Sequence, residues 1–524
     1  QDIRNRFPDK VRDEAKKLDN AEVSAADCEG RMDLRALPIF TIDSAETKDI
    51  DDAISLTKTS DGGFELGVHI ADVSNYVKPG TELDNEAFSR ATSVYYADQV
   101  VPMLPKALSN GICSLNENEL RLAFSCLMRL DKEGNLTDYR FVKSIIRSRV
   151  KGVYSEINAL LAGTADAEIK AKYADVIDQL PAMKELYGHR ARLRKERGCM
   201  DIESGEVKLI LDEDGHCIDV KKRTSGESEA MIEEFMLLAN QCAANAGRTN
   251  KVPFVYRVHE APDAEKMEKL SATLLACGLN AKFKNPIPTQ LELAALLDET
   301  RDQPIQIPVH TGILRSMQKA RYAPQPLGHY GLATPNYCHF TSPIRRYADL
   351  VVHRSLNPLL ANPPKGAKGA GSAGRLEEDA EHISETERIS ASAEKDANRM
   401  KLFEWLEGQC YTEHPEVHEA LVTETRHFGV LLEIPRLQIK GLVKPDKLPG
   451  GRWVYEAFAS RWKNDHGSVL CAGLRVPVIP VKVDREQQWA DFAIVSREKP
   501  RQTGKTAFPA KQEKGTSGHG RRNR

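Results

Sequence analysis

The segment TIDSAETKDIDDAISL, residues 41–56, holds five carboxylates within ten positions and a single lysine. These carboxylates are Asp43, Glu46, Asp49, Asp51 and Asp52. Each ionised carboxylate raises the pKa of its neighbours, so such a cluster is costly unless cations neutralise it. Mg²⁺ prefers hard oxygen ligands, and two such ions can activate water and stabilise a leaving oxygen in phosphodiester cleavage. The spacing is compatible with a magnesium site and also with a solvated acidic loop.

A second group of residues lies in HFTSPIRRYADLVVHR at residues 339–354. Its Ser-Pro pair is typical of a helix start, which predicts Arg345 and Arg346 in the first helical turn. Cations are unfavourable there with respect to the helix dipole, unless a phosphate meets the arginines and the free backbone N–H groups. Pairing of Arg345 with Asp349, four residues later, is the structural alternative. Together with the acidic segment, the pattern indicates phosphodiester chemistry.

The composition describes a soluble globular protein of more than one domain. The chain has 524 residues, 41% of them hydrophobic and 29% charged, which is too long for one ordinary core. No run approaches the ~18 apolar residues of a membrane span, and the charged N-terminal segment does not resemble a secretory signal. Ten cysteines without a C-x-x-C pair predict reduced thiols. We expect a cytoplasmic monomer without membrane contact.

Patterns along the chain predict its organisation. Residues 1–30 form a polar, partly helical lead-in, and strand and helix patterns then mix over residues 31–408, including a hairpin around a DGG turn. A low-complexity insert occupies residues 362–374 of this unit. Short alternating runs in residues 415–496 predict a small β-barrel. Residues 497–524 hold nine Lys or Arg and two Glu, a net charge of +7, and are expected to be disordered.

Several long sequence segments, in the same order along the chain, resemble those of the RNB family of exoribonucleases. They include the acidic segment, LGVHIADVSNYVKPGTELDNEA, TSVYYADQ, EEFMLLAN, VYRVHE, SMQKARY, LGHYGLA and the Ser-Pro-Ile-Arg-Arg segment. The resemblance implies a mixed α/β RNB-type catalytic domain at 31–408, then an all-β OB-fold RNA-binding domain and the basic tail. It also implies processive 3′-to-5′ hydrolysis of single-stranded RNA to nucleoside 5′-monophosphates. The implied cofactor is Mg²⁺, with Mn²⁺ as a substitute, in a two-metal mechanism.

The same resemblance assigns roles to residues of the two segments. Asp51 matches the indispensable aspartate that helps to organise the nucleophilic water, and Arg345 matches the arginine that steadies the scissile phosphate. Arg346 is expected to contact the RNA backbone. The implied metal ligands are Asp43, Asp49, Asp51 and Asp52.

Further residues match positions along the RNA path. Tyr95 resembles the aromatic residue that stacks on the 3′-terminal base, a contact that tolerates any base. Tyr154, Glu233 and Glu394 fall on RNA-lining positions, although each is also compatible with a core or helix-surface residue. In the barrel, Phe428 is the candidate stacking residue.

The chain also departs from the family pattern. Family members carry two cold-shock-type OB-folds before the catalytic unit, whereas about 40 residues precede the acidic segment here, which indicates a shortened chain or a compact variant. Ile202 stands where an aromatic residue usually faces the terminal base. The basic tail is compatible with contacts to structured RNA, the ribosome or RNA-decay proteins, and equally with a merely solubilising or nonspecifically binding role. The alternatives are a catalytically weak RNA-binding regulator and a nuclease that also degrades single-stranded DNA.

Overall fold

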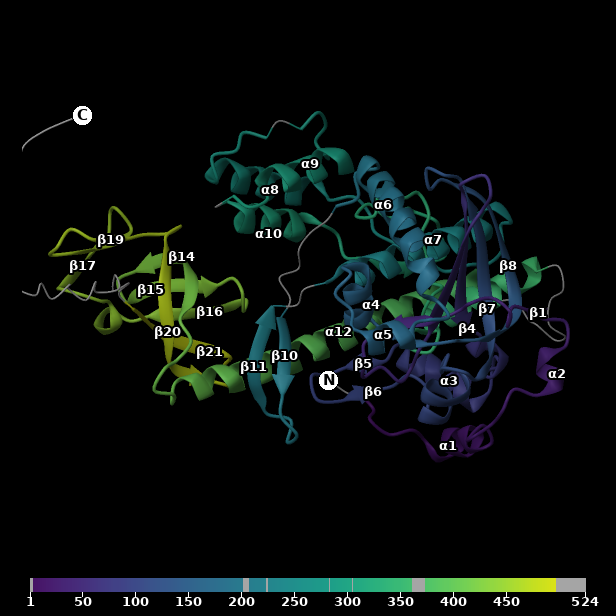
Figure 1. Cartoon of the computed structure of the whole chain (residues 1–524). Helices are drawn as coiled ribbons and strands as arrows, with labels where there is room; N and C mark the ends of the chain where they lie inside the picture. The colour runs from purple at the N-terminus through teal and green to yellow at the C-terminus, as the bar shows by residue number, and fades with distance from the viewer. Residues whose placement is uncertain are drawn as a thin grey trace, which may run out of the picture. The chain divides into compact units, whose positions relative to one another are not determined.

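The computed structural model divides into two compact units, Gln1–Trp405 and Leu406–Arg524 (Figure 1). The residues that it describes are 3–200, 207–222, 225–281, 283–303, 305–360 and 373–495. Ile202, nearly all of the low-complexity insert and the whole basic tail therefore lie outside the described residues. Within the described part, no helix is long and apolar enough to span a membrane.

The first unit is built on a five-stranded sheet in the order β1–β8–β7–β4–β3. Its strands are β1 (Met32–Asp33), β3 (Asp52–Lys58), β4 (Phe64–Ala71), β7 (Leu120–Leu130) and β8 (Leu136–Arg147). Only β1 and β8 pair in parallel; the other neighbours are antiparallel. The predicted hairpin is confirmed as β3–β4, whose DGG turn uses Gly62 at φ +84°, a conformation that suits glycine.

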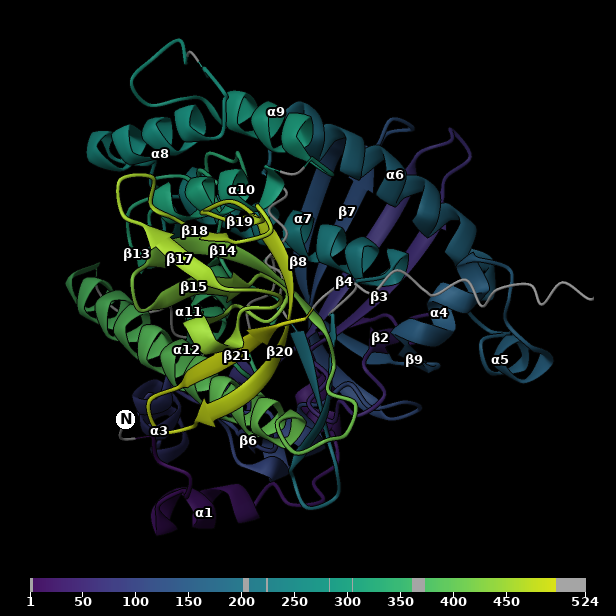
Figure 2. The same ribbon diagram turned by 90° about the vertical axis from the view of Figure 1, so that its left-hand side faces the viewer.

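Hydrophobic cores lie on both faces of this sheet. The large side chains of β4 and β7, such as Phe64 and Phe124, pack with residues of α6 (Leu180–Glu196) and α7 (Glu227–Thr249), such as Leu186 and Phe235, and Figure 2 shows both helices across the strands. The opposite face carries small residues such as Ala71 and packs against α1 (Asp9–Lys16), α3 (Glu82–Arg90) and α11 (Tyr347–Leu356). Val11 and Ala15 of α1 are buried in this second core, so part of the predicted polar lead-in, residues 1–30, packs against the sheet.

Helices and short paired strands complete the first unit. The helices are α1 (Asp9–Lys16), α2 (Ala25–Cys28), α3 (Glu82–Arg90), α4 (Tyr154–Leu161), α5 (Ala167–Lys172), α6 (Leu180–Glu196), α7 (Glu227–Thr249), α8 (Ala264–Ala276), α9 (Gln290–Thr300), α10 (Gln306–Ser316), α11 (Tyr347–Leu356) and α12 (Ala373–Gln409). The short helical turns are η1 (Val73–Asn75), η2 (Ala107–Ile112), η3 (Ile177–Gln179) and η4 (Asn357–Leu359). The paired strands are β2 (Thr41–Asp43) with β9 (Lys151–Val153), β5 (Val94–Tyr95) with β6 (Val100–Val101), β10 (Val207–Leu211) with β11 (Cys217–Lys222), and β12 (Tyr256–Val258) with β13 (Arg321–Ala323).

The second unit contains a closed five-stranded barrel in the order β14–β15–β16–β21–β20. The barrel strands are β14 (His418–Arg426), β15 (Gly429–Ile434), β16 (Ile439–Val443), β20 (Arg475–Asp484) and β21 (Trp489–Ile494). Between β16 and β20 the chain forms η5 (Pro445–Lys447) and a sheet of β17 (Trp453–Glu456), β18 (Arg461–Asn464) and β19 (Val469–Leu470). At Gly441 a Cβ would lie 2.3 Å from the Phe492 ring, so glycine allows β16 and β21 to pair. The predicted fold class, an α/β unit followed by a small barrel, is confirmed.

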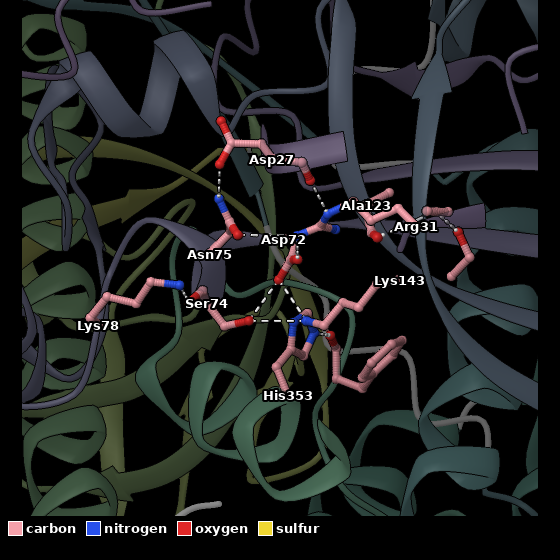
Figure 3. Close-up of polar contacts among 12 residues, drawn as sticks. Asp27, Arg31, Asp72, Ser74, Asn75, Lys78, Ala123, Lys143 and His353 are labelled. Atoms are coloured by element: carbon pink, nitrogen blue, oxygen red, sulfur yellow. Dashed lines mark hydrogen bonds and ion pairs between the residues drawn. The ribbon is translucent and has the colours of Figure 1, made fainter. Parts of the chain in front are cut away.

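A buried ion network anchors Arg31, just before β1, to the central sheet (Figure 3). Asp72, just after β4, accepts hydrogen bonds from Lys143 Nζ at 2.7 Å, Arg31 Nη2 at 2.8 Å and Ser74 Oγ at 2.6 Å. Burial alone would raise the pKa of Asp72, but the charges of Lys143 and Arg31 outweigh it and hold that pKa far below its usual range. Arg31 is thereby fixed to the end of β4, a central strand of the sheet.

Candidate active site

The acidic segment forms a loop between the ends of two strands. Asp43 is the last residue of β2 and Asp52 is the first residue of β3. The strands are held together through the bridge between Phe40 and Ile54. The two carboxylates therefore come close: burial, followed by the charge of Asp43, raises the pKa of Asp52 to about 7. Burial likewise raises the pKa of Asp43.

Neighbouring side chains hold the backbone of this loop. Ser114 Oγ accepts a hydrogen bond from Ile50 N at 3.0 Å and donates one to Lys48 O at 2.8 Å. Lys151 Nζ donates to two loop carbonyls at 2.7 and 3.1 Å. These contacts fix the loop without neutralising its carboxylates. Ser114 and Lys151 were missed by sequence reasoning, because the backbone groups that they bind carry no sequence signal.

Asp51 lies buried between the acidic loop and the Ser-Pro-Ile-Arg-Arg segment. It is 4% exposed, and its Oδ1 accepts a hydrogen bond from Ile344 N at 2.8 Å. Its Oδ2 lies 3.8 Å from Arg345 Nε and has no hydrogen-bond partner among the described residues. Burial raises the pKa of Asp51 well above its usual value, and the charge of Arg345 offsets this only in part. A buried oxygen without a partner at a charged site is typical of a group that meets a ligand.

The two arginines do not lie in a helical turn, which corrects the prediction from the sequence. Helix α11 begins at Tyr347, and Arg346 is its N-terminal cap in an extended conformation. The N–H groups before it are bound by carboxylates: Ser342 N donates to Asp349 Oδ1 at 2.7 Å, and Ile344 N donates to Asp51. The segment therefore forms a turn.

The predicted alternative, pairing of Arg345 with Asp349, is also wrong. Arg346 takes that position, with Nε and Nη2 at 2.9 and 2.8 Å from the two Asp349 oxygens. Arg345 is left beside Asp51, and its side chain is 43% exposed. Arg346 therefore stabilises the turn, whereas Arg345 is available to a ligand.

Tyr95 joins the acidic loop to helix α12. Its hydroxyl donates to Asp49 Oδ2 at 3.3 Å, and its backbone N–H donates to Glu394 Oε1 at 2.6 Å. Burial raises the pKa of Glu394, opposed by this N–H group and by the charge of Arg345, so these three residues share one region. The Tyr95 side chain keeps an exposed face, since the residue is 36% exposed.

The remaining predicted residues differ in their surroundings. Tyr154 begins α4 beside the acidic loop: burial, followed by the charges of Asp52 and Asp43, raises the pKa of its hydroxyl. Glu233 lies exposed on α7 and pairs with Arg194 at 3.2 Å, without a hydrogen bond to the loop among the described contacts. Phe428 is exposed beside the β14–β15 turn of the second unit.

The carboxylates match a hard divalent cation in donor chemistry. Asp43, Asp51 and Asp52 all have raised pKa values, so added positive charge would stabilise their ionised forms. The partnerless Asp51 Oδ2 supplies one free ligand atom. In the part of the chain that the structure describes, however, no group of three His, Cys, Asp or Glu side chains is assembled as a metal cage. The donors fit a hard divalent cation in their chemistry, but among the described residues they are not gathered into a cage.

Comparisons with known proteins place the chain in a family. A model of the RNB domain matches residues 31–362. Ribonuclease R 1 of Lactococcus lactis is 38% identical over 499 residues, which cover 95% of this chain and 60% of that protein. Ribonuclease R of Thermotoga maritima is 39% identical over 497 residues, which cover 94% of this chain and 68% of that protein.

Comparison with solved structures agrees with the family match. The solved structure of Mycoplasma genitalium RNase R in complex with ribose methylated single-stranded RNA superposes with a TM-score of 0.81 at 28% identity, covering 94% of this chain and 76% of that one. The chain therefore belongs to the RNB family, and the predicted resemblance is confirmed. It spans about 60% of the length of the Lactococcus relative.

Proposed function

We propose that this protein is a 3′-to-5′ exoribonuclease that processively hydrolyses single-stranded RNA to nucleoside 5′-monophosphates. The observation that carries the proposal is the buried Asp51, which has one oxygen bound to the Ile344 N–H and the other facing Arg345 without a hydrogen bond. Its membership of the RNB family and its similarity to ribonucleases R support the same reaction.

Arg345 and Asp51 would have different roles at the reacting phosphate. Arg345 would bind the scissile phosphate, because its guanidinium is half exposed and is only loosely paired, 3.8 Å from Asp51. Asp51 would orient the attacking water, since its backbone partner fixes the carboxylate plane. Water attacks phosphorus, the bond to the 3′-oxygen of the preceding nucleotide breaks, and the phosphate leaves with the terminal nucleoside.

The acidic loop would hold the metal. Asp43, Asp49, Asp51 and Asp52 are the proposed ligands of Mg²⁺, or of Mn²⁺ in its place, in a two-metal arrangement. The cations would supply the charge that keeps these carboxylates ionised and that activates water for attack.

The other site residues would bind the RNA strand. Tyr95 would stack on the 3′-terminal base, with its backbone fixed by Glu394 and its hydroxyl by Asp49. Tyr154 and Glu394 would line the same end of the strand. Arg346 is assigned instead to the turn, because its guanidinium is largely buried against Asp349.

We assign catalysis to residues 31–408 and further RNA binding to the barrel, residues 415–496. In the barrel, Phe428 offers an exposed ring with His427 beside it, their centroids 5.3 Å apart. Glu233 would contact RNA more remotely, after release from Arg194. A cytoplasmic monomer, and contacts of the tail with ribosomes or RNA-decay proteins, complete the proposal.

The test uses a 5′-labelled single-stranded RNA and the matching DNA, with Mg²⁺ or with a chelator. We expect a ladder that shortens from the 3′ end of the RNA alone, release of 5′-monophosphates, and no reaction without divalent cations. Asp51→Asn should lower the rate about 10³-fold, since several kcal/mol of charge stabilisation are lost at about 1.4 kcal/mol per tenfold, and should leave RNA affinity nearly unchanged.

Asp33→Asn is a matched control, because Asp33 forms an exposed pair with Arg35 away from the loop. Binding without cleavage by the wild type would favour an RNA-binding regulator instead. Equal degradation of DNA would favour a less selective nuclease. Unchanged cleavage by Asp51→Asn would rule out the proposed mechanism.

A further inference from the structure

The N-terminal segment, residues 3–20, packs against helix α3. Figure 1 shows α1 beside α3, and Val11 and Ala15 of α1 are buried in the core that α3 shares. The segment precedes residue 31, where the match to the RNB domain begins.

Glu14 of α1 caps the first turn of α3. Its Oε2 accepts a hydrogen bond from Leu83 N at 3.0 Å. Thr81, the N-cap residue, accepts from Asp84 N at 3.2 Å in the same turn. The first N–H groups of a helix have no partner within the helix, so these side chains fix where α3 begins. One of the two belongs to the N-terminal segment.

Arg90 connects the same segment to the other end of α3. It is the last residue of α3, its side chain is buried, and its guanidinium lies 3.9 Å from the centre of the Phe7 ring. Its Nη2 donates to Arg6 O at 2.9 Å, and its Nε donates to Glu86 at 2.8 Å. The segment thus contacts both ends of α3.

The residues that follow α3 hold the backbone of the arginine turn. Ala91 O accepts a hydrogen bond from Tyr347 N at 2.8 Å, and the carbonyl of Arg345 accepts from Ser93 N at 2.9 Å and from Thr92 Oγ1 at 3.1 Å. Ala91 adopts φ +54°, which turns the chain sharply toward these partners. The position of Arg345 along its turn is therefore set from the end of α3.

We propose that residues 6–14, through α3, are a positioning device for Arg345. The proposal rests on the function assigned above and adds Glu14 and Phe7, which contact α3, as positioning residues outside the acidic loop. The physical reason is that the Arg345 side chain is itself weakly fixed, with Ser342 Oγ at 3.1 Å and Asp51 at 3.8 Å. Its placement then depends on its backbone, and a misplacement of about 1 Å at a reacting group can cost up to about 100-fold in rate.

The test is a double-mutant cycle on single-turnover hydrolysis, with enzyme in excess over a short labelled RNA. Glu14→Ala is expected to lower the saturated rate about 3- to 10-fold, a fraction of the largest positional effects, with unchanged RNA affinity and a melting temperature lowered by only about a few degrees, because the Leu83 N–H loses its partner. Glu14→Gln keeps an oxygen acceptor for Leu83 N and should restore the rate. Asp13→Ala is the matched control, because Asp13 is the preceding residue of α1 and forms an exposed pair with Lys16.

The decisive measurement repeats Glu14→Ala and Phe7→Ala in an Arg345→Ala background. If the segment acts through Arg345, each change costs less than about twofold there, because coupled residues do not add. An equal loss in both backgrounds would show a general structural effect and overturn the inference. So would full activity of both single variants in the wild-type background. A wild-type protein that cleaves no RNA would instead refute the proposed function, which keeps the two failures distinct.

Discussion

Asp72 and Asp51 are both buried beside the central hairpin, yet their surroundings have opposite effects on them. Asp72 is 1% exposed and Asp51 is 4% exposed. Their backbones are close, since Ala71 N donates to Asp51 O at 2.8 Å. The pKa of Asp72 is held far below its usual range, whereas that of Asp51 is raised well above it.

The difference lies in the positive charge that each carboxylate receives. Asp72 has Lys143 at 2.7 Å and Arg31 at 2.8 Å (Figure 3). Asp51 has Arg345 at 3.8 Å, and that guanidinium also faces solvent. A buried carboxylate with close cations has a structural role. One that lacks close positive charge can bind a metal ion, which supplies that charge. Burial alone does not distinguish the two.

The largest expected effect on stability comes from Asp72→Asn. It should lower the free energy of unfolding by about 3–5 kcal/mol, because Lys143 and Arg31 stay buried without a counter-charge. Urea titration at pH 7 measures the change. Asp33→Asn, which breaks an exposed pair, should leave the midpoint nearly unchanged. Equal midpoints for Asp72→Asn and wild type would remove the contrast between the two aspartates.

The destabilisation by Asp72→Asn should also depend on pH. The folded pKa of Asp72 lies below the unfolded value of about 3.9, so the unfolded chain takes up the proton first as the pH falls. The stabilisation is therefore complete above about pH 4 and is lost below it. Urea titrations of both proteins at a series of pH values should show their difference shrinking in acid. A constant difference would contradict the lowered pKa.

Asp51→Asn is expected to act in the opposite direction on stability. Asparagine can still accept the Ile344 N–H and carries no charge to bury, so metal-free protein should become more stable by about 1–2 kcal/mol. The measurement is the same urea titration in a chelator. Destabilisation comparable to that of Asp72→Asn would mean that Asp51 is as well paired as Asp72.

The smallest expected effect is the response of stability to Mg²⁺, which we assign to Asp52. Its folded pKa of about 7 exceeds the unfolded value of about 3.9, so metal-free stability should fall as pH rises between these values. At pH 8, Mg²⁺ at ten times its dissociation constant should add about 1.4 kcal/mol. Thermal unfolding with and without Mg²⁺ measures both effects. Asp52→Asn should reduce both, and an undiminished response in that variant would exclude Asp52 as a ligand.

The sequence predicted those parts of the molecule that local patterns determine. Alternation around the DGG turn predicted β3–β4, because side-chain period and turn chemistry act over a few residues. The barrel was predicted in the same way. Long segments similar to those of the RNB family indicated that the acidic segment and Arg345 belong to one site. Local spacing alone left that question open.

Contacts between distant segments account for what the sequence did not predict. The helix does not start at the Ser-Pro pair because the N–H groups of Arg345 and Arg346 bond back to Ser342 O in a turn and Arg346 is extended, so α11 begins only at Tyr347. The choice of Arg346 over Arg345 as the partner of Asp349 follows from that turn. The pairing of Asp72 with Arg31 and Lys143 depends on how β4, β8 and the residues before β1 pack together, which no local pattern encodes.

The hydrogen bond between Asp51 and Ile344 has a consequence for synthesis of the protein. These residues are 293 positions apart, and Tyr95 and Glu394 are 299 apart. Translation proceeds from the N-terminus, and contacts of such long range form late. The acidic loop is therefore synthesised long before Arg345 and α12, with which it makes these contacts. The pair proposed to act on the phosphate, Asp51 and Arg345, is therefore among the last parts of the first unit to be assembled.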